Sequence, residues 1–127
     1  MIDHISIAVS DLRRSAGFYR AVLEPLGLAQ LVERPLTIGF GKKYPEFWLN
    51  ARPDMRPVPD DTGAHACLRA PDIAAVEAFH RAALEHGGRD DGPPGPRQGE
   101  MTAYFGAFIR DPDGNKIEAV CFPRPAT

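Results

Sequence analysis

His4, His65 and Glu118 are the residues of this 127-residue sequence whose types and positions best suit metal chemistry. Each of the three lies in or beside an apolar run that is typical of a strand. Two imidazoles and one carboxylate that leave coordination positions open suit a divalent ion such as iron(II), manganese, nickel or zinc. The same residue types also occur as hydrogen-bonded core residues, so their spacing by itself leaves both interpretations open.

An internal repeat relates the two histidines. Shifting the sequence by 61 residues places His4 on His65 and Asp11 on Asp72. Four further pairs match at the same offset: Leu12 with Ile73, Phe18 with Phe79, Leu23 with Leu84, and Gly27 with Gly88. The pairs keep one order of strand histidine, helix-capping aspartate, core aromatic residue and helix-ending glycine, which indicates a duplicated supersecondary unit.

Each half is predicted to contain a strand, a helix and three more strands. The first half has strands at Ile2–Val9, Leu28–Glu33, Leu36–Gly41 and Glu46–Asn50, with a helix from Leu12 to about Gly27. The second has strands at Gly63–Ala70, Arg89–Asp91, Thr102–Arg110 and Asn115–Phe122, with a helix from Ile73 to about Gly87. Proline-rich stretches at Arg52–Pro59 and Gly92–Pro96 are expected to be loops.

The predicted fold is therefore α+β, with two βαβββ modules that form a curved mixed sheet around a cleft. The chain is expected to be one domain, residues 1–127, with module one at about 1–52 and module two at about 63–124. Successive side chains of a strand point to opposite faces, and the apolar series of each strand marks the face toward its helix. His4, His65 and Glu118 have the other parity, so we expect all three to line the cleft.

Three stretches resemble the vicinal oxygen chelate superfamily: Asp3-His4-Ile5, Gly63-Ala64-His65-Ala66 and Asp111-Pro112-Asp113-Gly114-Asn115-Lys116-Ile117-Glu118. This superfamily contains glyoxalase I, extradiol dioxygenases, fosfomycin-resistance enzymes and bleomycin-resistance proteins. The resemblance covers almost the whole chain, and the last stretch is its most specific part. It implies paired βαβββ modules, frequently a homodimer, with metal ligands at His4, His65 and Glu118.

Two departures from these relatives narrow the expected chemistry. In glyoxalase I a fourth ligand comes from the last strand of the first module, and the matching stretch here, residues 45–49, has Trp48 in that place. A three-ligand site remains, which is closer to the extradiol dioxygenases. Those enzymes also use further acid-base histidines, and the loop Gln98–Thr102 contains none.

Four other side chains are candidates for binding a substrate. Trp48, Tyr104 and Phe108 can stack on a flat molecule, although aromatic residues of strands are often plain core. Arg69 shares its parity with His65 and either pairs with an anionic substrate group or lies at a solvated strand end. Glu100 is expected to be exposed, with a role in a lid as the alternative.

Charge, the N-terminal residues and the cysteines argue against nucleic-acid binding, a membrane anchor and a disulfide. Fifteen basic and 17 acidic residues give a formal net charge of -2, and no basic run is present to bind nucleic acid. Residues 1–10 lack the pattern of a signal peptide or membrane anchor, so we expect a cytoplasmic protein. Cys67 and Cys121 lie in apolar runs and are predicted to be small buried residues rather than a disulfide.

The leading hypothesis is a metal-dependent enzyme acting on a small molecule that offers two adjacent oxygens to the ion. Lyase or isomerase chemistry of the glyoxalase type is favoured over dioxygenase or thiol-transfer chemistry, and Glu118 is the candidate catalytic residue. The alternative is a metal-free protein that sequesters a drug or metabolite between the subunits of a homodimer. A scaffold with a vestigial cleft is a third possibility. The substrate, the metal and the mode of dimerisation do not follow from the sequence.

Overall fold

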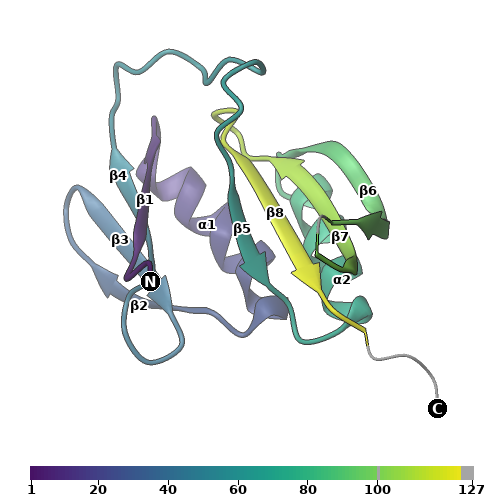
Figure 1. Cartoon of the computed structure of the whole chain (residues 1–127). Helices are drawn as coiled ribbons and strands as arrows, with labels where there is room; N and C mark the ends of the chain where they lie inside the picture. Colours follow the sequence, from purple (N-terminus) through teal and green to yellow (C-terminus); the bar gives the residue numbers. More distant parts are fainter. Residues whose placement is uncertain (100, 124–127) are drawn as a thin grey trace.

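The computed structural model describes residues 1–99 and 101–123, and it shows two four-stranded sheets, each with one α-helix (Figure 1). The first half contains β1 (Ile5–Val9), α1 (Leu12–Leu23), the short 3-10 helix η1 (Glu24–Leu26), β2 (Ala29–Glu33), β3 (Thr37–Gly41) and β4 (Phe47–Ala51). The second contains β5 (Ala66–Arg69), α2 (Ile73–Glu85), β6 (Arg89–Gln98), β7 (Ala103–Arg110) and β8 (Lys116–Cys121). The strand orders are β1-β4-β3-β2 and β5-β8-β7-β6, and the first and last strand of each half pair in parallel. The predicted duplication of a βαβββ module is confirmed.

Both helices begin at the aspartates that the repeat places in register. The Asp11 carboxylate accepts a hydrogen bond from the backbone N–H of Arg14, and Asp72 accepts one from Ala75. Gly27 ends the first helical segment with φ of 81°, in the left-handed region that glycine adopts without a steric cost. Local capping chemistry therefore sets the helix ends as the sequence predicts.

The sixth strand is longer than predicted. We expected Arg89–Asp91 alone and a loop over Gly92–Pro96, but β6 continues to Gln98, with bulges between Asp90 and Gly92 and between Gly92 and Gly95. An inner strand has a neighbour on each side, so nearly all of its backbone N–H groups donate to one strand or the other, and proline has no N–H to donate. Because β6 is the outer strand of its sheet, its prolines need no partner on the free edge.

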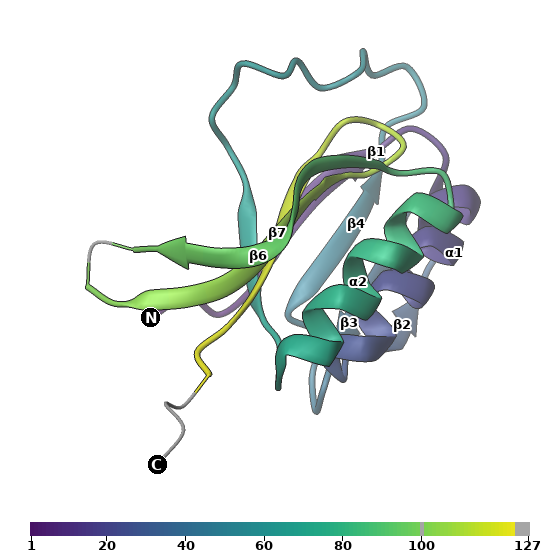
Figure 2. The same ribbon diagram turned by 90° about the vertical axis from the view of Figure 1, so that its right-hand side faces the viewer.

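The core lies between the sheets and the helices. The two helices lie on one side of the molecule, while β1, β5 and β8 lie on the other (Figure 2). The alternating apolar residues of β1, β5 and β8 belong to the core, as their parity predicts: Ile5, Ile7, Val9, Ala66, Leu68, Ile117, Ala119 and Cys121. In the part of the chain that the structure describes, no helix covers the opposite face of either sheet, and we call these two surfaces the open faces.

The turn before β8 joins the two modules. The buried Asp111 carboxylate accepts a hydrogen bond from the Tyr19 hydroxyl of α1 at 2.7 Å. Asp113 accepts hydrogen bonds from the backbone N–H and the side chain of Ser10, and the Asn115 amide donates to the carbonyl of Ala8. The most specific stretch of the sequence thus holds module two against the start of α1 and the end of β1.

The helices of the described residues are short. None of them combines the length and the apolar composition that crossing a membrane requires.

Candidate functional site

His65 and Glu118 form a close pair on the open face of the second sheet. The Nε2 atom of His65 lies 3.1 Å from Oε1 of Glu118. Their proximity follows from the parallel pairing of β5 with β8, in which Cys67 is the direct partner of Glu118 and His65 lies two residues earlier on the same face. Glu118 is only 5% exposed. A carboxylate buried to this degree needs partners that offset its lost hydration.

Two further side chains, Cys67 and Tyr104, lie close enough to Glu118 for its charge to affect their pKa values. Partial burial of the thiol against the sheet, followed by the charge of Glu118 and hydrogen bonding to it, raises the pKa of Cys67 to about 12. The same causes raise the pKa of Tyr104 above its usual value. Both groups are therefore protonated near neutral pH and can donate to the carboxylate. Glu118 lies within a polar cluster that also contains His65, Cys67 and Tyr104.

The prediction that Cys67 is a buried apolar residue is wrong. Its side chain is exposed on the open face, whereas Cys121 is buried as expected, and both are free thiols. Cys67 has the same strand parity as His65 and Arg69, and this parity indicates that its side chain lies on the open face. An apolar run alone was misleading because β5 has one open face.

His4 is near the pair but does not join it. It lies one residue before β1, is exposed, and its Nδ1 atom is 2.7 Å from the Asp3 carboxylate. A groove of about 550 Å³ between β1 and β5 is lined by both His4 and His65, together with Tyr44, Glu46 and Cys67. Within the described residues, no group of three or more histidine, cysteine, aspartate or glutamate side chains is arranged to hold a metal ion. One chain therefore brings together two of the three predicted ligands.

The His65–Glu118 pair fits part of a divalent metal site. Two ligand atoms that are each about 2.1 Å from one ion, at roughly a right angle, are about 3 Å apart. The observed 3.1 Å matches this separation, and imidazole with carboxylate is a donor set used by zinc, iron and manganese. The pair also fits an ordinary hydrogen bond. In the described part of one chain, no third histidine, cysteine, aspartate or glutamate is arranged with the pair to complete a metal site.

The predicted substrate-binding residues divide between the two open faces. Phe108 contacts the edge of the His65 ring, with ring centres 5.8 Å apart, and Tyr104 packs near Phe122 at 6.1 Å. The Arg69 guanidinium lies over the Phe122 ring at 4.6 Å. Phe108 and Arg69 therefore flank the polar cluster, of which Tyr104 is a member.

Trp48 lies on the first sheet instead. Its neighbours in the core-facing register, Phe47 and Leu49, are buried, and Trp48 itself is half-buried on the open face. The guanidinium of Arg34 is 5.6 Å from its ring. Glu100, for which exposure was expected, falls outside the described residues.

Replacing Tyr104 with phenylalanine is expected to lower the affinity for zinc, because the hydroxyl beside the Glu118 carboxylate is lost while the aromatic ring is kept. Loss of a polar neighbour that orients a metal-binding carboxylate typically lowers metal affinity about 10-fold or more. Calorimetric titration with zinc checks this, and His86→Ala, exposed at the end of α2 and away from the pair, is the control. Equal affinities for the two variants contradict a role for Tyr104 in holding Glu118.

Comparison with known proteins agrees with the fold. The model of the Glyoxalase/Bleomycin resistance protein/Dioxygenase superfamily matches residues 1–119. Among curated proteins, no sequence matches this chain.

Several solved structures are similar. A glyoxalase/bleomycin resistance protein from Albidiferax ferrireducens T118 is 31% identical, with a TM-score of 0.83, and the alignment covers 94% of this chain and 97% of that one. Glyoxalase I from Zea mays is 23% identical, with a TM-score of 0.73, and the alignment covers 94% of this chain but 45% of the maize chain. At that identity, the maize enzyme supports the shared fold alone.

Proposed function

Because the chain belongs to the Glyoxalase/Bleomycin resistance protein/Dioxygenase superfamily, we propose that it is a metal-dependent enzyme acting on a small molecule. In this proposal the metal site is completed between two copies of the chain. The observation that carries it is the 3.1 Å pair of His65 and Glu118 on an uncovered sheet face. The third ligand is His4 of the second copy.

The open faces support assembly into a homodimer. They carry partly exposed aromatic side chains, including Trp48, Tyr104 and Phe108, and Phe122 is 43% exposed. Uncovered apolar surface of this kind marks places where another molecule packs. A two-fold axis that sets the first sheet of one copy against the second sheet of the other creates two equivalent sites.

The side chains around the pair have distinct tasks in the proposed reaction. A bound divalent ion supplies Lewis acidity that stabilises negative charge on substrate oxygens. Phe108 provides a flat apolar surface beside His65, and Arg69 offers a guanidinium to an anionic substrate group. Glu118 is proposed to accept a proton from a substrate carbon and to return it to the product, which is the proton transfer that lyase or isomerase chemistry requires.

Metal binding tests the proposal directly. Protein purified without chelator and dialysed against nickel, zinc, manganese or iron(II) is expected to hold one ion per chain, and His65→Ala is expected to hold none. His86→Ala is the control, because His86 is exposed at the end of α2, away from the pair. Elemental analysis measures the ratio. Wild-type protein that retains no more metal than His65→Ala contradicts a metal-dependent function.

A second candidate function is metal-free sequestration of a small molecule in the same homodimer. It is favoured because, in the described part of one chain, no three histidine, cysteine, aspartate or glutamate side chains are arranged to hold a metal ion. A dimer that binds none of the four metals, and in which small aromatic acids quench the fluorescence of Trp48 with saturable binding, supports this alternative. A protein that binds neither metal nor small molecule favours a scaffold.

A further inference from the structure

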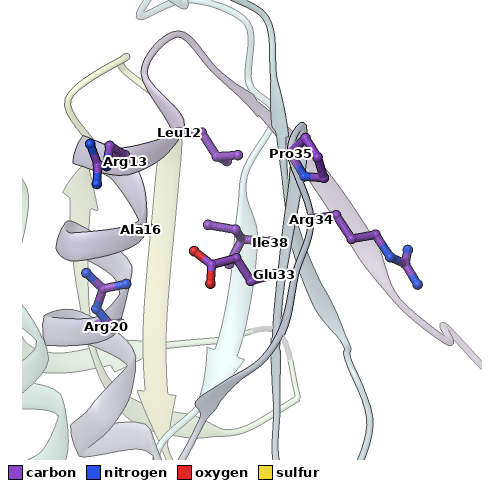
Figure 3. Close-up of a pocket in the computed structure, with 8 residues that line it drawn as sticks. All are labelled: Leu12, Arg13, Ala16, Arg20, Glu33, Arg34, Pro35 and Ile38. Atoms are coloured by element: carbon purple, nitrogen blue, oxygen red, sulfur yellow. The ribbon is translucent and has the colours of Figure 1, made fainter.

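A second cavity lies in module one, on the side where the helices pack. It has a volume of about 610 Å³ and opens between α1 and the turn that joins β2 to β3 (Figure 3). Its lining consists of Leu12, Arg13, Ala16, Arg20, Glu33, Arg34, Pro35 and Ile38. It shares no residue with the His65–Glu118 pair or with the groove lined by His4. This cavity is therefore separate from the candidate metal site.

The walls of the cavity are charged, with an excess of positive charge. Arg13 and Arg20 are seven residues apart on α1, two helical turns, so their side chains line the same side of the helix. Figure 3 shows both guanidinium groups along that wall, with the Glu33 carboxylate reaching from the opposite strand. The charged groups that face the cavity are therefore the two arginines of α1 and Glu33, since the Arg34 guanidinium is turned away and lies over the Trp48 ring. Two positive charges against one negative charge favour an anionic ligand.

The charged groups are largely unpaired within the described residues. Arg20 donates a hydrogen bond to the side-chain oxygen of Gln30 at 2.8 Å, and no salt bridge there involves Arg13, Arg20 or Glu33. An uncommitted guanidinium keeps a planar set of donors that matches a carboxylate or phosphate. Arg13 and Arg20 therefore remain available to a ligand.

The floor of the cavity is apolar. Ala16 and Ile38 are 2% and 3% exposed, and Leu12 is half-buried beside them. An apolar floor with a few polar groups at the rim is the usual composition of a small-molecule site, and the volume is in the usual range of such sites. A ligand that fits both parts carries an acidic group and a short apolar body.

We propose that this cavity binds a small organic anion, with the acidic group held by Arg13 and Arg20 and the apolar part on Leu12, Ala16 and Ile38. The site is independent of the proposed metal chemistry. Carboxylates and phosphate monoesters share the required chemistry. Glu33 limits affinity for such ligands because its carboxylate faces the same space.

Titration with phenyl phosphate, benzoate and inorganic phosphate, monitored by amide NMR shifts, tests the proposal. It also distinguishes a phosphate monoester from a carboxylate as the preferred acidic group. Either aromatic acid is expected to shift Leu12, Ala16 and Ile38 and to bind more tightly than inorganic phosphate, and the tighter of the two identifies the group. Arg13→Gln with Arg20→Gln is expected to weaken binding about 10-fold or more. Arg81→Gln, on the exposed surface of α2, is the matched control and is expected to have no effect.

Glu33→Gln provides an independent check, since loss of the like charge is expected to tighten binding. Three results overturn the proposal. The first is that no aromatic acid binds with Kd below roughly 1 mM. The second is equal weakening by Arg81→Gln and by the Arg13 and Arg20 variants. The third is a set of shifts confined to β5 and β8, which assigns the ligand to the open face.

Discussion

Chains with His4→Ala and chains with Glu118→Ala are each expected to bind no metal alone, and to bind one ion per dimer when they assemble together. The reason is the cross-chain site proposed for His4 and the His65–Glu118 pair. In the mixed dimer, one site combines both substituted residues and is lost. The other combines the intact His4 of one chain with the intact pair of the other. Tandem purification on two different tags, followed by elemental analysis, measures the ratio.

The matched control places both substitutions in one chain and pairs it with the wild-type chain. If the sites are shared between chains, one of the two sites in this dimer lacks Glu118 and the other lacks His4, so the dimer is expected to hold no ion. A site built within one chain gives the reverse pattern, with one ion in this control and none in the mixed dimer. The two arrangements therefore separate the cross-chain site from a site within one chain, and both use proteins with the same overall set of substitutions.

Replacing Asp111 with alanine is expected to destabilise the fold by about 3 to 5 kcal/mol, since each buried donor left without a partner costs roughly 1 to 3 kcal/mol. The Asp111 carboxylate accepts hydrogen bonds from the Tyr19 hydroxyl, from the backbone of Asp113 and from the backbone and side chain of Asn115. Its loss leaves three donors without this acceptor, the Tyr19 hydroxyl and the backbone N–H groups of Asp113 and Asn115, while the Asn115 amide keeps its hydrogen bond to Ala8. Urea unfolding at 25 °C measures the change in the free energy of unfolding.

The contribution of Asp111 comes from satisfying these donors and not from a favourable charge. Burial raises the pKa of Asp111 even though its hydrogen bonds act in the other direction. Asp54→Ala is the control, because Asp54 is exposed in the linker. A loss of stability no larger than in that variant contradicts the assignment of this turn as the link between modules.

The position of Asp111 also explains the most specific motif of the sequence. The Asp111–Glu118 stretch has two roles. Its first half joins the two modules, and its last residue, Glu118, lies at the candidate site. The hairpin signal predicted the turn correctly, but the partner of Asp111 is 92 residues away on α1. No local pattern contains that information.

Strand parity accounts for the predicted positions of His65 and Glu118, although it placed His4 with them as well. It placed Glu118 and His65 on one face, and the parallel pairing of β5 and β8 brings them together. The same rule indicated that Cys67 faces outward, while the apolar run indicated burial, and parity was the better guide. Residue type describes burial poorly on a sheet whose second face has no helix.

The sequence by itself determined the duplicated βαβββ order, the helix ends at Asp11, Asp72 and Gly27, and the faces of the strands, because these depend on neighbours within a few residues or on a repeat of the whole unit. Only the tertiary structure decided that His65 and Glu118 meet while His4 stays outside the pair, and that β6 extends through its prolines at a sheet edge. It also created the cavity beside Arg13 and Arg20. These features depend on how separate elements pack against one another, and packing is a property of distances in space that spacing along the chain does not encode.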